Sequence, residues 1–185
     1  MKQFIRSMVL ACAFAGVAFA GQEPSTTKPQ PASPKEKPAS SDATFMGTAA
    51  MDGLAEVEHG RLATQNASAP DVKQFGQRMV DDHSKAGDEL KALASKKAVS
   101  LPTELDQKHR AMHDRLAKLK GAAFDKAYMT HMVTAHQQAV ALFQKESKGG
   151  SDTDVKAWAA KTLPTLQEHH KMAQSVSATV NKAAK

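Results

Sequence analysis

Several side chains able to bind a metal lie on otherwise apolar helical faces of this sequence. At about 100° per residue, His83, His136 and His169 each fall within an apolar stripe. Glu56 and His59 share the apolar face of an earlier segment. Neutral imidazoles with one carboxylate suit Zn, Cu, Ni or Fe, whereas Mg and Ca prefer oxygen ligands. The sequence therefore predicts a single transition-metal site whose ligands are Glu56, His83, His136 and His169, with His59 as a candidate additional ligand.

Estimated heights along a helical bundle place the four predicted ligands at a similar level. With ~1.5 Å per residue, Glu56 lies roughly 18 Å above the end where the first helix starts. On the same scale His83 and His136 lie roughly 11–13 Å above that end, and His169 lies roughly 20 Å above it. All four therefore fall near the middle of the bundle, as a shared site requires.

Other interpretations of these histidines stay open. A histidine on an apolar face is commonly a hydrogen-bonded core residue, and neighbouring histidines can supply its partners. The chain would then be a structural or interaction bundle of the cell envelope that binds no metal. A noncovalent haem is a further alternative, because the sequence has no Cys-x-x-Cys-His attachment motif. Met79, Met129 and Met132 would favour Cu(I) as ligands, although methionine is also an ordinary core residue.

The elements that must position these residues are helices. The chain after Asp42 is rich in Ala, Lys, Gln, Leu and Met, and prolines and glycines divide it into five segments. Long helices are expected over residues 43–66, 70–97, 122–147 and 151–181, with a shorter helix between Pro102 and Gly121. The last helix is expected to open with the capping box Ser151-x-x-Asp154.

The spacing of apolar residues predicts how these helices associate. Apolar residues recur at helical spacing along each long segment, and no strand pattern competes with them. Such stripes are typical of helices that surround a shared core. We therefore predict an all-α fold, an antiparallel four-helix bundle with a short helical crossover between the second and third long helices.

The N-terminal residues predict export. Lys2 and Arg6 precede an apolar run, Ser7–Ala20, that ends in the small-x-small pattern of a signal-peptidase site. The run is shorter than the roughly 20 apolar residues that span a bilayer stably. We therefore assign residues 1–20 to a signal peptide cleaved after Ala20, which leaves no membrane-spanning segment. A lipoprotein signal ending at Cys12 is the alternative, and its apolar core would be very short.

The segment after this cleavage site has the composition of a tether. Residues 21–42 are rich in Pro, Ser, Thr and Lys and contain no large apolar residue. Such a segment cannot bury enough surface to offset the entropy of ordering it. Residues 43–182 then form the helical domain, whose length suits one domain with its own core.

Charge and motifs exclude several classes of function. Cleavage after Ala20 removes the only cysteine and lowers the formal charge of +6 by two. A mature chain without cysteine forms no disulfide, and its remaining charge is too weak to predict nucleic-acid binding. The sequence contains neither Gly-x-Ser-x-Gly nor the zinc-protease motif His-Glu-x-x-His, so we assign no catalytic residue.

The sequence blocks around the predicted ligands resemble a known exported bacterial family. These blocks are AEVEHGRLA, VKQFGQRMVDDH, GAAFDKAYMTHMVTAHQQAVALF and LPTLQEHHKMA. In this order they resemble domain-of-unknown-function family 4142, often labelled predicted outer-membrane protein, over residues 43–180. The resemblance implies a ferritin-like bundle, with the family's motif histidines at His83, His136 and His169 and its acidic position at Glu56. His59 stands where relatives more often have a leucine.

The resemblance also bears on the metal chemistry and the location. Ferritin-like di-iron enzymes place Glu on two helices and Glu-x-x-His on the other two. In this sequence only Glu56-x-x-His59 has that spacing, which favours mononuclear binding by histidines over a di-iron oxidase. The family label, together with the predicted signal peptide, implies a location in the periplasm or in association with the outer membrane.

Overall fold

The structure is a computed structural model that describes residues 38–183. These residues form five helices, which are α1 (Ser40–Asn66), α2 (Pro70–Lys97), α3 (Gln107–Ala117), α4 (Gly121–Gly149) and α5 (Thr153–Ala183). The predicted signal peptide and most of the predicted tether lie outside the described residues. No helix in the described range combines the length and the apolar character needed to cross a bilayer.

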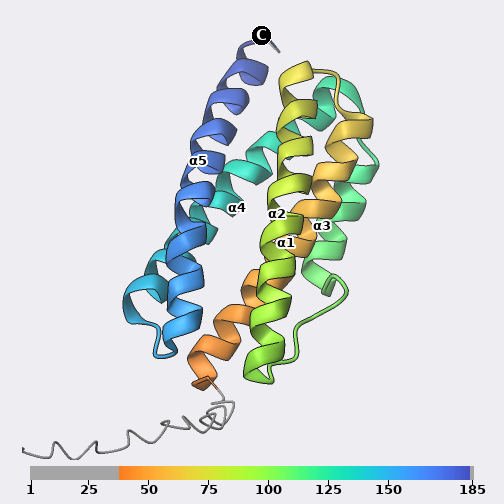
Figure 1. The fold of residues 1–185 in the computed structure, drawn as a ribbon. Coiled ribbons are helices and arrows are strands. Elements are labelled where there is room, and N and C mark those ends of the chain that lie inside the picture. The colour runs from red at the N-terminus through yellow and green to blue at the C-terminus, as the bar shows by residue number, and fades with distance from the viewer. Residues whose placement is uncertain (1–37, 184–185) are drawn as a thin grey trace, which may run out of the picture. The chain divides into compact units, whose positions relative to one another are not determined.

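The four long helices pack as two antiparallel pairs. α1 packs along α2, and α4 packs along α5, while α1 also contacts α4 and α2 contacts α5. Figure 1 shows α3 running beside α1, so that the chain returns along the bundle before α4 begins. Residues 38–183 contain no β-strand. The predicted all-α, ferritin-like bundle with a short helical crossover is therefore confirmed.

Buried apolar side chains form two clusters along the bundle, and histidines lie between them. On α2, His83 lies between Met79 of one cluster and Leu90 of the other. In the same way, His136 of α4 and His169 of α5 each lie between a residue of one cluster and a residue of the other. Because the clusters fix the helices on both sides, the histidines are held in the middle of the bundle by packing rather than by loops.

Two glycines let α1 and α2 approach each other closely. A Cβ atom on Gly60 would lie 2.6 Å from the carbonyl oxygen of Gly76, and one on Gly76 would lie 2.5 Å from Cβ of Ala63. Neither position has room for a side chain without a shift of backbone. This contact sets the distance between α1 and α2 immediately after His59.

The first residues of α1 and α5 differ from the prediction, and hydrogen bonds to the carboxylates of Asp42 and Asp152 explain the difference. α1 begins at Ser40, so Asp42, assigned from the sequence to the end of the tether, is a buried helical residue. Its carboxylate accepts hydrogen bonds from the N–H groups of Ser151 and Asp152 at 3.2 and 2.7 Å. The side chain of Asp152 in turn accepts from two N–H groups of the first turn of α5. Asp152 therefore caps α5 in place of the predicted Ser151.

Candidate metal centre

Three histidines from three helices meet between the two apolar clusters. They are His83 of α2, His136 of α4 and His169 of α5, and we call them the histidine triad. The ring centres are 5.7 Å apart for His83 and His136, and 5.4 Å apart for the other two pairs. One ring nitrogen of each lies within 4.8 Å of the other two. Nitrogens bound to one tetrahedral ion at about 2.0–2.1 Å are about 3.4 Å apart, so small side-chain movements would close the triad on an ion.

Two of the three rings are held in one tautomer by hydrogen bonds on the far side of the ring. Nδ1 of His136 donates to the backbone carbonyl of Met132 at 3.0 Å, and Nε2 of His169 donates to Oδ2 of Asp82 at 2.8 Å. Because these oxygens only accept, Nε2 of His136 and Nδ1 of His169 carry the lone pairs. Metal-binding histidines show this same arrangement, with the second nitrogen donating to a carbonyl or a carboxylate.

One ring nitrogen of each triad histidine is buried and unpaired among the described residues. Nε2 of His136, Nδ1 of His169 and Nε2 of His83 have no hydrogen-bond partner among the residues that the structure describes. An unpaired buried polar atom costs about 1–3 kcal/mol, and a hydrogen-bonded core network would avoid that cost. The donor set fits a transition-metal ion, which accepts an electron pair from each imidazole.

Burial keeps the triad neutral at pH 7. It lowers the pKa of His136 to about 3 and, with the neighbouring imidazoles, the pKa of His83 well below 6.5. Burial also lowers the pKa of His169, although the carboxylate of Asp82 opposes this shift. The neutral imidazole is the form that binds a metal, so the triad need not release protons to do so.

Glu56, which the sequence analysis expects as a fourth ligand, lies outside the triad. Among the described residues the convergent group consists of the three histidines. The Glu56 side chain is buried, and its Oε2 has no hydrogen-bond partner within that part of the chain. Burial, assisted by the charge of Asp52, raises the pKa of Glu56 to about 8. Its carboxyl group is therefore mostly protonated at pH 7, and a nearby cation would favour the ionised form.

His59 belongs to a second group of histidines. Its ring centre lies 5.2 Å from that of His131 on α4 and 6.2 Å from that of His113 on α3. We call these three residues the His59 group. Burial and the imidazoles of His131 and His113 lower the pKa of His59 to about 3. The nearby backbone of His109 acts in the opposite direction, raising the pKa of His59. It does not form a hydrogen bond of good geometry with the His59 ring.

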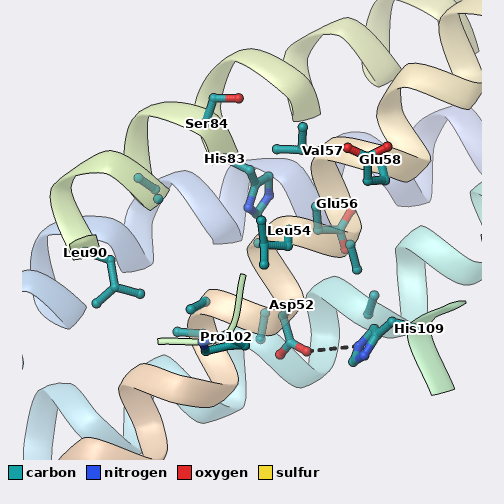
Figure 2. Close-up of a pocket in the computed structure, with 18 of the residues that line it drawn as sticks. Asp52, Leu54, Glu56, Val57, Glu58, His83, Ser84, Leu90, Pro102 and His109 are labelled. Atoms are coloured by element: carbon teal, nitrogen blue, oxygen red, sulfur yellow. Dashed lines mark ion pairs between the residues drawn. The ribbon is translucent and has the colours of Figure 1, made fainter. Parts of the chain in front are cut away.

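A partly open cavity of about 700 Å³ reaches the triad. It is lined by residues of all five helices, among them His83 and His136. Figure 2 shows His83 and Glu56 projecting into this cavity from α2 and α1. At its wall, Nε2 of His109 lies 3.3 Å from Oδ1 of Asp52. His83 and His136 therefore face a cavity whose wall also contains polar and acidic side chains.

Asp82 is a site residue that the sequence analysis misses. It directly precedes His83, yet its carboxylate bonds to His169 across the interface of α2 and α5. Arg78 also donates to Asp82, from Nε at 2.6 Å. Burial would raise the pKa of Asp82, but the hydrogen bonds from Arg78 and His169 bring it below its ordinary value. The i, i+4 spacing of Arg78 and Asp82 is the one sequence signal for this carboxylate.

The methionines near the histidines lie in the apolar core. Met79, Met129 and Met132 are fully buried in one cluster with Phe75 and Tyr128. Their packing accounts for their presence without a role as metal ligands.

The comparison with family models gives one match over most of the chain. A model described as "Domain of unknown function (DUF4142)" matches residues 27–176, a range that includes the whole triad. No curated protein matches the sequence.

Several solved structures are similar to this chain. A fragment of a DUF305 protein from Deinococcus radiodurans has a TM-score of 0.69 and 11% identity, over 77% of this chain and 99% of that one. A DUF305 protein from Streptomyces coelicolor, provisionally described as secreted, has a TM-score of 0.65 and 14% identity, over 76% and 92%. CopM in the Cu(II)-bound form has a TM-score of 0.63 and 17% identity, over 75% and 96%. At these identities the likeness shows the fold alone.

Proposed function

The chain belongs to the DUF4142 family, and we propose that it binds one transition-metal ion through His83, His136 and His169. The observation that carries this proposal is the convergence of three neutral imidazoles, each with a buried nitrogen that has no hydrogen-bond partner in the described residues. The carbonyl of Met132 and the carboxylate of Asp82 orient two of the rings toward the ion.

Copper is the first ion to test. Imidazole suits Zn, Cu, Fe and Ni, and among divalent ions of the first row Cu(II) is bound most tightly by a given set of nitrogen ligands. The similar fold of CopM, which was solved with Cu(II) bound, supports the same choice. Glu56, in the wall of the same cavity, would balance the charge of the ion when the ion promotes its ionisation.

We infer a role in storing or buffering the ion outside the cytoplasm, with a connection to metal stress. The predicted signal peptide supports export, as does the provisional description of the Streptomyces coelicolor protein as secreted. The partly open cavity lets an ion reach the triad and exchange, as storage or buffering requires.

The test is elemental analysis of the protein purified without an affinity tag, beside a His83→Ala/His136→Ala variant and a His170→Ala control. His170 follows His169 directly but lies outside the triad. We expect the wild type and the control each to hold one metal ion more than the double variant holds. We also expect the melting temperature of the wild type to rise with added metal. A folded wild type that retains no metal and gains no stability from it would replace this proposal with the structural bundle.

A further inference from the structure

The His59 group lies apart from the triad, on the side of the bundle formed by α1, α3 and α4. The triad uses α2, α4 and α5, so the two groups share one helix and no residue. The rings of His59 and His131 meet edge to face at 72°, whereas those of His59 and His113 are nearly parallel at 23°.

His59 is an unexplained polar residue in the core. Its exposure is 0%, and neither ring nitrogen has a hydrogen-bond partner within residues 38–183. A neutral imidazole carries one donor and one acceptor, and leaving both unpaired in the core destabilises the fold. An apolar residue of similar size would avoid this cost, so the structure indicates a function for the ring beyond packing.

The spacing of the rings fits a shared ion for one pair and comes close for the other. Two imidazoles that bind one ion at about 2.0–2.1 Å have ring centres about 5–5.6 Å apart. The separation of 5.2 Å between His59 and His131 falls in this range, although the ligand nitrogens of the His59 group, unlike those of the triad, do not all lie within 4.8 Å of one another. His113, at 6.2 Å, lies on the short helix α3 with a partly exposed side chain, so a change of rotamer can bring its ring closer.

Two hollows lined by charged side chains reach the His59 group. His131 lines the large cavity, and His113 lines a second, more open hollow that shares Leu54, Glu58 and Thr103 with it. The walls of these two hollows contain six acidic side chains, Asp52, Glu56, Glu58, Asp88, Glu104 and Asp114, and four basic ones, Arg61, Lys91, Lys108 and Arg110.

We propose that His59 and His131, joined by His113, form a second binding site for a transition-metal ion, separate from the triad. The ligands are neutral nitrogens from α1, α4 and α3. Because the ring of His113 lies farther from that of His59 than any two rings of the triad lie from each other, this site binds its ion more weakly and exchanges it faster. The chain then holds two ions in one bundle, an inner one and one that exchanges more readily.

The experiment is a titration of the whole chain with Cu(II) in a glycine buffer, which competes with weak surface binding. Two double variants separate the sites, His59→Leu/His131→Gln for the second site and His83→Ala/His136→Ala for the triad. We expect two equivalents of Cu(II) in the wild type, one in each double variant and none in the combined variant. His170→Gln serves as the control and is expected to bind two.

The outcomes distinguish this inference from the proposed function. If the His59→Leu/His131→Gln variant still binds as many ions as the wild type, the second site does not exist. If the triad variant binds no ion, the second site is likewise refuted. If the wild type and the triad variant both bind one ion that the His59→Leu/His131→Gln variant loses, the second site stands and the proposed function fails.

Two further measurements guard against misfolding. Circular dichroism must show wild-type helix content in each variant, and His59→Leu favours folding because it removes an unpaired polar group from the core. His113→Ala changes only a partly exposed residue of α3. It should weaken the second site about tenfold or more while the triad is unaffected, and nitrogen couplings in the electron paramagnetic resonance spectrum should decrease. Unchanged affinity and couplings would remove His113 from the site.

Discussion

Oδ2 of Asp82 on α2 accepts a hydrogen bond of 2.8 Å from Nε2 of His169 on α5. The same oxygen accepts from Nε of Arg78 at 2.6 Å, and Arg78 also approaches Glu168 at 3.7 Å. This chain of polar contacts orients a buried imidazole from the edge of the bundle. It leaves Nδ1 of His169 as the nitrogen available to an ion, which makes Asp82 a residue whose effect on metal binding can be measured.

Removing Asp82 should weaken metal binding without removing a ligand. In Asp82→Ala, His169 loses the acceptor that fixes its tautomer, so we expect Cu(II) affinity to fall about 10–100-fold. The control is Asp81→Ala, since Asp81 is exposed and, within residues 38–183, its side chain bonds only to Gln77 on its own helix. Competition with a chelator of known affinity measures both variants. Equal affinities for the two would show that the Asp82–His169 hydrogen bond does not support binding.

Metal binding by the triad should resist mild acid. Three imidazoles with an ordinary pKa of about 6.5 would lose about a thousandfold in affinity between pH 7.5 and 5.5, because protons compete for each lone pair. Burial lowers the pKa of all three histidines, that of His136 to about 3. We therefore expect a loss of less than about tenfold, measured by competition and corrected for protonation of the competitor. A thousandfold loss would place the ion on exposed histidines.

Glu56→Gln should stabilise the metal-free protein increasingly as pH rises. The folded-state pKa of Glu56 is raised from 4.5 to about 8, so between these values the folded state binds a proton that the unfolded state has lost. The stability of the wild type therefore falls as pH rises through this window, by up to about 1.4 kcal/mol per pH unit from this group. Gln carries no charge and removes the effect.

Urea unfolding at pH 5, 6.5 and 8 measures this difference. Glu58→Gln is the matched control, because Glu58 lies on the same helix with an exposed side chain and a long ion pair to Arg61. We expect the difference in the free energy of unfolding between Glu56→Gln and the wild type to increase with pH. The difference between Glu58→Gln and the wild type should stay constant. Parallel behaviour of both variants would mean that Glu56 is ionised in the folded protein.

The contact between α1 and α2 should not tolerate a methyl group. In Gly60→Ala the new Cβ would lie 2.6 Å from the carbonyl oxygen of Gly76, so the helices must separate, at a cost of about 1–3 kcal/mol. Gly47→Ala is the control, since no atom lies within 4 Å of its added Cβ. There we expect a gain of about 0.5–1 kcal/mol from helix propensity. Thermal unfolding of both variants checks the opposite signs, and a stabilised Gly60→Ala would contradict the close approach.

Local signals explain why the helices and the inward histidines could be predicted. Apolar periodicity is a property of consecutive residues, so it placed His83, His136 and His169 on inward faces before their neighbours were known. Prolines and glycines likewise marked the helix ends to within a few residues. The cap at Asp152 was missed because Asp42, distant in sequence, holds the preceding residues.

The composition of the site could be predicted only in part. Heights estimated from the sequence are uncertain by several ångströms. This is more than the difference in position between a side chain that binds an ion and one that lies beside it. The estimate groups Glu56 with the histidines, and the structure places Glu56 in the wall of the cavity that reaches them, with a raised pKa. Asp82 was not grouped with them, since a residue beside His83 on the same helix points in a different direction.

The sequence by itself determined that this chain forms a helical bundle with histidines on its inner faces, because both properties follow from the spacing of residue types along each helix. It could not determine which side chains from different helices meet. Those contacts depend on the rotation and the axial offset of each helix. The packing of the two apolar clusters and the close contact between Gly60 and Gly76 determine both. Only the tertiary structure divided the inner histidines into the triad and the His59 group. Only the tertiary structure joined Asp82 to His169, because a hydrogen bond between helices needs both positions at once.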